Sequence, residues 1–473
     1  MKKIMTLICC LGIFAASCDD FLDRNPFTSI SNERAIIDAV TANHSLLGLY
    51  DRLQTEARYG RMIFVTADAA TENVILAPTT ASRFLAVAQW TTTISSGEPT
   101  TSIFAACYVI IYAANEILAR VDNIDGTDAE KQKIKGEALA LRGLMHFELV
   151  RLFSQAYAGN ENDPLGIAYK TNPDIYELPA RETLRTTYDM IIDDLLSACS
   201  LLTPANTAGH APYRIDHWSA KAILARVYMA QLDYAKARPL LADIINNSGY
   251  TILSNGNYRE SWGKRYNAAS KTEYMFAIAN MSDDYGNTAS LGYIYLPNGY
   301  SDLRVPTDFF AMYDEDDVRK QTFFSAGVGP NVGWTLVTKF PNRDGFNGLS
   351  DHPVMRYSDV YLMYAEACAY TGDEATAINY LDRVRLRAQP SAAPSTETGD
   401  ALKDKIFLEK RKEFAYEGHY YHDLKRHRKT ILSAFNAAGQ RFATITPPDT
   451  RLAFAIPTQE MEVNPNMVQN PGY

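Results

Sequence analysis

Residues 224–244, LARVYMAQLDYAKARPLLADI, and residues 364–384, YAEACAYTGDEATAINYLDRV, share one pattern of small, acidic and apolar residues. Small residues at such places let two antiparallel helices approach closely, and an aspartate in the turn between them can cap the second helix. In the second copy Gly372 precedes the aspartate. The pattern therefore predicts two helix pairs of the tetratricopeptide type. The matched residues are Ala225 and Ala365, Asp233 and Asp373, Ala237 and Ala377, and Leu241 and Leu381.

Two segments upstream carry the same helical periodicity. In residues 133–153, KIKGEALALRGLMHFELVRLF, apolar residues recur every three or four positions, and residues 182–202, ETLRTTYDMIIDDLLSACSLL, repeat this spacing. Thr183 is a candidate N-cap of the second helix, and Pro204 marks its end. Residues 250–350 are instead rich in Tyr, Gly, Asn, Asp and Ser, which predicts loops, short strands and brief helices. We therefore expect an all-α, tetratricopeptide-like helical-repeat scaffold with an irregular, loop-rich half.

The chain begins with two lysines and a short apolar segment, residues 4–16, followed by the small residues of AAS and then Cys18. The segment is too short to cross a bilayer, which takes roughly 20 apolar residues, and it is typical of a secretory signal peptide. Cys18 resembles the lipidated cysteine of a bacterial lipobox, although Ala15 stands where lipoboxes usually carry Leu. We expect cleavage before Cys18 and acylation of that residue, because stable anchoring takes more than one acyl chain. The alternative is an ordinary signal peptide whose cleavage site happens to lie near Cys18.

The bulk properties limit the possible partners. The chain has 473 residues, 47% hydrophobic and 11% aromatic, with a formal net charge of −9. This charge argues against nucleic acid as a partner. No segment after the first is expected to cross a membrane. Cys107, Cys199 and Cys368 lie in apolar helical contexts and are expected to be buried thiols, not a disulfide framework or a metal site.

Several segments, in order, resemble the SusD/RagB family of outer-membrane nutrient-binding lipoproteins of Bacteroidetes. Residues 356–388, 406–426 (IFLEKRKEFAYEGHYYHDLKR) and 456–473 (IPTQEMEVNPNMVQNPGY) are similar to the C-terminal half of the family. Residues 136–157, 179–198 and 214–237, which overlap three of the helical segments described above, are similar to its N-terminal half. CDDFLDRNP, residues 18–26, is similar to its lipidated start. The resemblance runs from Cys18 to Tyr473 and is weakest over residues 250–350.

This resemblance implies a domain organisation and a role. It implies a signal peptide over residues 1–17, a lipidated tether over 18–35, an N-terminal helical half over 36–249 and a C-terminal half over 250–473, with a divergent ligand-binding insert at about 250–350. The implied protein is anchored to the outer membrane through Cys18 and faces the cell exterior, where Asp19 and Asp20 resemble a surface-export signal. It captures an oligosaccharide, or in some members a peptide, and passes it to a SusC-type TonB-dependent barrel. No catalysis and no cofactor are implied.

Two clusters of chemically active residues were weighed as catalytic or metal sites. Glu409, Glu413 and Glu417 alternate with Lys and Arg, which favours ion-paired helix faces over the opposed carboxylates of a glycosidase. His422 lies near two other histidines, His419 and His427, but nothing nearby completes a ligand set, so no metal site is predicted. The sequence contains no G-x-S-x-G, Walker, HExxH or C-x-x-C motif.

Aromatic residues in loops are the better candidates for ligand contact. The flat C–H faces of sugars stack on the electron-rich faces of Trp and Tyr, and loops carry function more often than the framework does. The alternative is that such rings close small hydrophobic clusters under long loops. The candidate ligand-binding residues are Trp90, Trp262, Tyr266, Tyr285, Tyr293 and Trp334, and Tyr295 and Tyr300 add further rings to this region.

The sequence is consistent with four functions. The first is an oligosaccharide-binding lipoprotein, which would bind without turnover and purify with a large barrel. The second is a peptide-binding member of the same family, which the sequence does not separate well from the first. The third is a secreted glycosidase, which would lose turnover when one carboxylate is replaced. The fourth is a helical-repeat adaptor, which would tolerate the loss of Trp90, Trp262 and Trp334.

Overall fold

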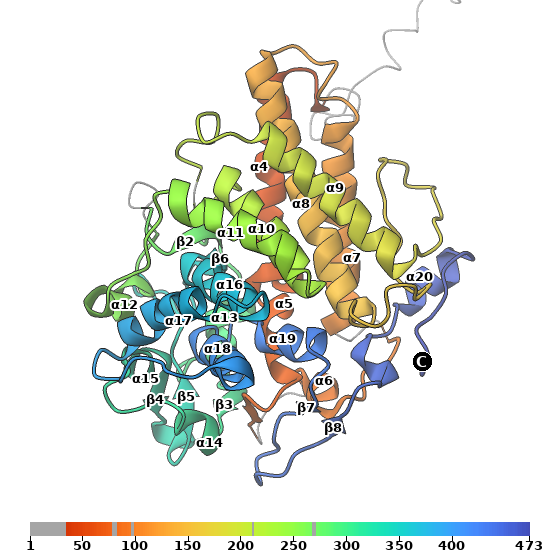
Figure 1. The fold of residues 1–473 in the computed structure, drawn as a ribbon. Coiled ribbons are helices and arrows are strands. Elements are labelled where there is room, and N and C mark those ends of the chain that lie inside the picture. Colours follow the sequence, from red (N-terminus) through yellow and green to blue (C-terminus); the bar gives the residue numbers. More distant parts are fainter. Residues whose placement is uncertain (1–34, 78–82, 96–98, 211, 267–270) are drawn as a thin grey trace, which may run out of the picture.

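The computed structural model describes residues 35–473 apart from 78–82, 96–98, 211 and 267–270. The predicted signal peptide, Cys18 and nearly all of the predicted tether lie outside the described residues. Long helices form one side of the molecule, and α8 packs against both α7 and α9 (Figure 1). Thr183 caps α9 as predicted, since its side chain accepts a hydrogen bond from the Thr186 backbone N–H. These helices are α4 (Ala39–Leu53), α7 (Pro99–Leu118), α8 (Asp128–Phe153) and α9 (Leu184–Leu201).

The two predicted helix pairs are both present. The first is α10 (His217–Ala230) with α11 (Tyr234–Asn247), and the second is α16 (Tyr357–Tyr370) with α17 (Glu374–Ala388). Asp233 and Asp373 are the N-caps of the second helices and accept hydrogen bonds from the backbone N–H groups of Lys236 and Thr376. α11 packs against α16, so the two pairs stack into one scaffold (Figure 1). The matched alanines, Ala225, Ala237, Ala365 and Ala377, are all fully buried.

Helix α7 corrects one expectation. It is long and apolar enough to cross a membrane by length and composition, although no membrane-crossing segment was expected after the signal peptide. Just over half of its apolar window is buried, and the helix packs against α4, α5 (Met62–Ala69) and α8. The apolar residues of α7 are therefore explained by its place in the interior of the helical half.

Residues 250–350 form short elements, as predicted. A four-stranded antiparallel sheet has the order β1-β3-β5-β4, and a second sheet pairs β2 (Tyr274–Ile278) with β6 (His352–Arg356). The strands of the first sheet are β1 (Ile75–Leu76), β3 (Leu303–Val305), β4 (Phe324–Ala326) and β5 (Thr335–Val337). The short helices are α12 (Asn255–Ser261), α13 (Leu291–Tyr295), α14 (Thr307–Phe310) and α15 (Val318–Phe323). β1 comes from the N-terminal half, so this sheet joins the insert to the helical scaffold.

The chain ends with α18 (Gly399–Glu413), α19 (Tyr420–Arg426), the strand pair β7 (Ile431–Leu432) and β8 (Thr444–Ile445), and α20 (Thr458–Val463). α18 packs against α16 and α17, and α19 packs against α5, α10 and α18. Cys107, Cys199 and Cys368 are free thiols, as predicted, and two of them are buried.

A buried ion cluster ties the insert to the C-terminal helices. Arg356, at the end of β6, donates from Nη1 to Glu273 Oε1 (2.6 Å) and Glu413 Oε1 (2.9 Å), and from Nη2 to Glu417 Oε1 (2.8 Å). Arg319 and Arg387 also donate to Glu413, at 3.1 Å and 2.8 Å. The ion pairing predicted for Glu409, Glu413 and Glu417 is confirmed, but their partners come from other elements and the pairs are buried. The ion cluster consists of Glu273, Arg319, Arg356, Arg387, Glu413 and Glu417.

Candidate functional site

Loops beside the β1-β3-β5-β4 sheet bring several aromatic rings to one surface. Tyr293 lies on α13 and Tyr300 on the following loop, and their ring centroids are 4.8 Å apart in an edge-to-face arrangement. The Tyr300 backbone N–H donates to Tyr293 O (2.8 Å), so the loop folds back on the helix that precedes it. Both rings are half-buried, which leaves part of each ring accessible.

A guanidinium group lies over the Tyr300 ring. The Arg83 guanidinium carbon is 3.7 Å from the ring centroid, and Arg83 Nε donates to Asp302 Oδ2 (2.6 Å). Burial raises the pKa of Asp302, and the adjacent Arg83 opposes this shift. The carboxylate thus fixes the guanidinium, and the guanidinium fixes the ring.

Trp334 is held in the same way on the neighbouring hairpin. The Arg304 guanidinium carbon lies 4.6 Å from the Trp334 ring centroid, and Arg304 Nη2 donates to Asn331 Oδ1 (2.8 Å). Asn331 Nδ2 donates in turn to Ser301 Oγ (3.4 Å), on the loop that carries Tyr300. Burial lowers the pKa of Arg304. This chain of contacts connects the Trp334 hairpin to the tyrosine loop.

A second pair of rings extends the surface. The Tyr285 and Phe346 ring centroids are 6.3 Å apart, and Tyr285 OH donates to Asn347 O (3.4 Å). Asn347 Nδ2 donates to Asn298 O (2.6 Å), which ties this pair to the tyrosine loop. We call the five rings and the two guanidinium groups the aromatic surface. Its members are Tyr285, Tyr293, Tyr300, Trp334, Phe346, Arg83 and Arg304.

Such a surface is suited to binding. Rigid aromatic rings offer flat faces to sugar C–H groups, and polar side chains between them can meet hydroxyl groups. Asp302 is 1% exposed and already bonded to Arg83, so it is not an opposed catalytic carboxylate.

Three of the predicted ligand-binding residues lie in the interior. Trp90 is 4% exposed, lies 6.3 Å from Phe454 between ring centroids and donates from Nε1 to Ala70 O (3.0 Å). Tyr266 is 7% exposed and stacks on Tyr274, with the ring centroids 3.4 Å apart. In these positions the rings pack against protein, and their contact with a ligand stays a prediction.

Trp262 is also buried, but it borders a surface groove. It is 3% exposed, and its Nε1 has no hydrogen-bond partner among the described residues. The groove has a volume of about 620 Å³ and is lined also by Arg259, Glu260, Lys264 and Gln321. Trp262 is therefore placed at the floor of a groove away from the aromatic surface.

The structure thus brings Tyr285, Tyr293 and Trp334 together and leaves Trp90, Trp262 and Tyr266 elsewhere. Sequence reasoning did not select Phe346, Arg83 or Arg304, and it mentioned Tyr300 only as a further ring. The two arginines were missed because a single arginine, in a turn as Arg83 is or in a short strand as Arg304 is, carries no signal of the ring that it covers. Among the described residues no group of three or more candidate metal ligands occurs, at the histidine cluster or elsewhere.

Comparisons with known proteins place the chain among SusD-like proteins. The family model described as the SusD family matches residues 311–473, and the model described as starch-binding associating with outer membrane matches residues 20–229. A SusD-like protein of Bacteroides ovatus is 24% identical and covers 89% of this chain and 82% of its own.

Solved structures share the fold over nearly the whole chain. A SusD superfamily protein of Bacteroides thetaiotaomicron superposes with a TM-score of 0.83 at 25% identity, over 92% of this chain and 100% of that chain. A SusD-like carbohydrate binding protein of Bacteroides vulgatus superposes with a TM-score of 0.80 at 22% identity, over 91% of this chain and 98% of that chain.

Proposed function

The chain belongs to the SusD family, and on this premise we propose that it captures an oligosaccharide at the aromatic surface and passes it to a SusC-type TonB-dependent barrel. The family is one of non-catalytic, outer-membrane-associated binding proteins, which agrees with the prediction that this chain is not an enzyme. The observation that carries the proposed ligand class is the pair of rings, Tyr300 and Trp334, each oriented by a guanidinium group.

Two further lines support a sugar as the ligand. The family model over residues 20–229 is described as starch-binding, and one solved protein of the same fold is described as carbohydrate binding. The ring planes of Tyr293 and Tyr300 meet at an angle of 73°, and each half-buried ring leaves part of itself accessible to a sugar C–H face.

The proposal extends to the anchor and the domain boundaries. Cleavage after residue 17 and acylation of Cys18 would tether the protein to the outer membrane, facing the cell exterior, through residues 18–35. The helical half, 36–249, and the C-terminal half, 250–473, would then form the scaffold that presents the insert at about 250–350. Cys18→Ala is expected to move the protein from the membrane fraction to the soluble fraction, and palmitate labelling of that variant would contradict the assignment.

The ligand class is tested by calorimetry on the soluble protein from Asp19 onward. Titrations would cover plant, host and microbial glycans and a peptide digest, with each positive ligand analysed for cleavage products. Saturable binding of one glycan class without products is the expected result. Binding of peptides alone would assign the chain to the peptide-binding members of the family, and cleavage that disappears with one carboxylate variant would establish a glycosidase.

The transfer step has its own test. Purification of the lipidated protein from membranes is expected to bring along a barrel large enough to be a TonB-dependent transporter. If the protein binds glycan but purifies without a barrel under mild detergent, the proposed capture of glycan stands and the proposed transfer to a barrel is contradicted.

A further inference from the structure

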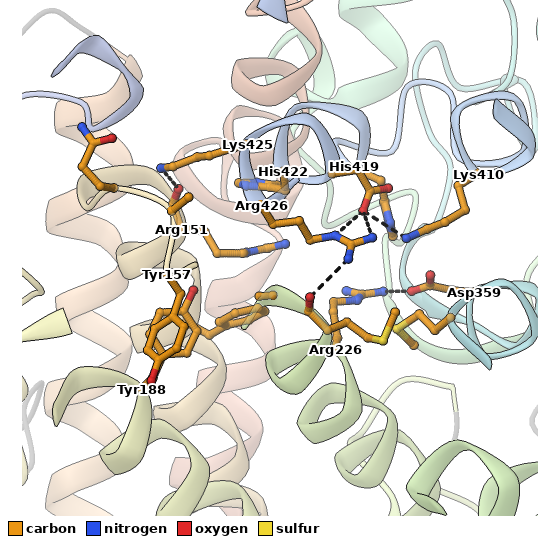
Figure 2. A pocket seen from close by; sticks show the side chains of 17 residues that line it. Arg151, Tyr157, Tyr188, Arg226, Asp359, Lys410, His419, His422, Lys425 and Arg426 are labelled. Carbon is orange, nitrogen blue, oxygen red and sulfur yellow. Dashed lines mark hydrogen bonds and ion pairs between the residues drawn. The ribbon is translucent and has the colours of Figure 1, made fainter. Parts of the chain in front are cut away.

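A cavity with apolar walls and several charged side chains lies beneath α19, and none of the residues of the aromatic surface lines it. Its volume is about 60 Å³, which is room for a few water molecules or one small polyatomic ion. Figure 2 shows His422 and Lys425 on α19, Arg151 on α8 and Arg226 on α10 around the same space. Helices from both halves of the chain therefore contribute cationic groups to one site.

Four of the cations around this cavity are paired with carboxylates. Arg151 pairs with Glu148, and Arg226 pairs with Asp359. The remaining two, Lys410 and Arg426, share Glu366 and Asp423.

Lys425 is the exception. Its ammonium group donates to Arg151 O and Ser154 O, both at 2.6 Å, and no carboxylate of the described residues lies within ion-pair distance of it. Burial, together with the charge of Arg151, lowers the pKa of Lys425 to about 7. Lys425 is therefore the one lining lysine or arginine without a carboxylate partner among the described residues, and a bound anion would stabilise its charged form.

Buried donors around the cavity also lack acceptors. His422 Nδ1, Arg151 Nε and Arg226 Nε have no hydrogen-bond partner among the described residues. His422 is 9% exposed, and burial together with Arg151 lowers its pKa well below the ordinary value, so the ring is neutral. Buried polar atoms without partners are rare because each leaves its desolvation cost uncompensated. The Nε–H groups of Arg151 on α8 and Arg226 on α10 therefore lack an acceptor at this cavity, and His422 Nδ1 adds a third donor in the tautomer that carries its proton on Nδ1.

A groove connects the cavity to the surface. It has a volume of about 450 Å³ and shares Gln155, Ala156 and Lys425 with the cavity. Its other wall comes from the C-terminal segment, with Pro448 and Asp449. An ion entering through this groove would pass Lys425 first.

We propose that this cavity binds a small inorganic oxyanion of the phosphate or sulfate class, held by Lys425, His422 and the Arg151 guanidinium. The anion accepts hydrogen bonds from α8 and α19 at once, and it thereby fastens the C-terminal half to the helical half. This site is independent of the ligand proposed for the aromatic surface.

Thermal unfolding of the soluble protein tests the proposal. Sodium chloride is replaced stepwise by sodium phosphate or sodium sulfate at constant ionic strength and pH. We expect a saturable rise in Tm, by about 3 °C at 100 times Kd. Calorimetric titration with the same salts is expected to show one site. A response no larger than that to chloride would overturn the proposal without touching the glycan-binding result.

Two variants four residues apart distinguish anion binding at the cavity from a general effect of salt on stability. Lys425→Met is expected to abolish the response, whereas Lys429→Met, which removes an exposed lysine paired with Asp404, is expected to keep it. An equal response in Lys425→Met would overturn the proposal. If that variant does not fold, the titrations of the unmodified protein decide the matter.

The source of the oxyanion is distinguished by size. A sugar phosphate monoester is too large for a cavity of about 60 Å³ and is expected to give no rise in Tm. A rise with the monoester but not with the inorganic salts would place the binding site in the groove and overturn the assignment to the cavity.

Discussion

The ion cluster and the aromatic surface both depend on arginine, but they use it differently. In the ion cluster Arg319 and Arg356 have side chains that are 1% exposed, and each meets at least two carboxylates. At the aromatic surface the Arg83 and Arg304 guanidinium groups lie over rings whose other parts remain accessible. In the ion cluster every guanidinium nitrogen of Arg319 and Arg356 donates inside the protein, whereas at the aromatic surface the guanidinium groups orient rings that stay partly accessible. Stability and ligand affinity should therefore respond to different substitutions.

The largest effect is expected when one carboxylate of the ion cluster is neutralised. Glu413 is fully buried and accepts hydrogen bonds from three arginines, so Glu413→Gln leaves buried positive charge uncompensated. We expect the free energy of unfolding to fall by about 3–5 kcal/mol, measured by urea titration. The control is Glu315→Gln, because Glu315 is an exposed partner of Lys320 and should change this value by less than about 0.5 kcal/mol. An equal loss in the free energy of unfolding for the two variants would contradict the view that the buried ion pairs stabilise the protein more than the exposed pair does.

A pH titration tests a buried carboxyl on α5. Asp68 accepts a hydrogen bond from Tyr295 OH (3.0 Å), and burial raises the pKa of Asp68 to about 7. A carboxyl whose pKa is higher in the folded state binds a proton more tightly there, so its contribution to stability declines as the pH rises from about 4 to about 7. We expect Asp68→Asn to remove a decline of the order of 4 kcal/mol over this window, measured by urea unfolding at several pH values. Identical pH profiles for the variant and the unmodified protein would contradict the raised pKa.

At the aromatic surface the expected effect is on affinity. Trp334→Ala removes a ring that is oriented by Arg304, and we expect the Kd for the bound glycan to rise about tenfold, which corresponds to about 1.4 kcal/mol. The free energy of unfolding should change by less than about 1 kcal/mol, because the ring is half-buried on a hairpin. Tyr176, which is 82% exposed elsewhere on the surface, gives the control Tyr176→Ala with no change in either value. A loss of stability without a loss of affinity would assign Trp334 to packing.

The smallest effect concerns the turn between the helices of each repeated pair. Gly372 has a φ of 85°, and the equivalent residue of the first pair, Leu232, has a φ of 61°. A side chain in this left-handed region costs about 1 kcal/mol, so Gly372→Ala should lower the free energy of unfolding by that amount. An added Cβ at Gly372 meets nothing within 4 Å, so the change in the free energy of unfolding reports the cost of the backbone conformation alone. An unchanged free energy of unfolding would show that this turn holds a side chain in the left-handed region without a measurable cost. The turn of the first pair already carries Leu232 in that region.

The scaffold could be predicted from sequence because its determinants are local. Periodic apolar residues, paired alanines and the capping aspartates Asp233 and Asp373 each act within a few residues of their position, so a single sequence displays them. The short elements of residues 250–350 were also predicted in kind, although their strand pairings were not, because β1 meets β3 across a long stretch of chain.

The candidate site was only half predictable for the opposite reason. Tryptophan in a loop has the same local appearance whether it is buried, as Trp90 is, or half-buried, as Trp334 is. What separates them is a distant partner: Phe454 packs against the first, and Arg304 covers the second. Burial by residues far apart in sequence leaves no pattern around the ring itself.

The hairpin that carries Trp334 is closed at its base. The Gly327 backbone N–H donates to Trp334 O (2.8 Å), and a Cβ on Gly327 would lie 2.0 Å from Asn331 O, so glycine is required there. β4 and β5 flank the turn and pair directly with each other through their backbones. Asn331 and Trp334 tie the turn to Ser301 and Arg304, so substitutions at the other exposed positions of the turn are expected to leave both strands in place while they change what a ligand meets.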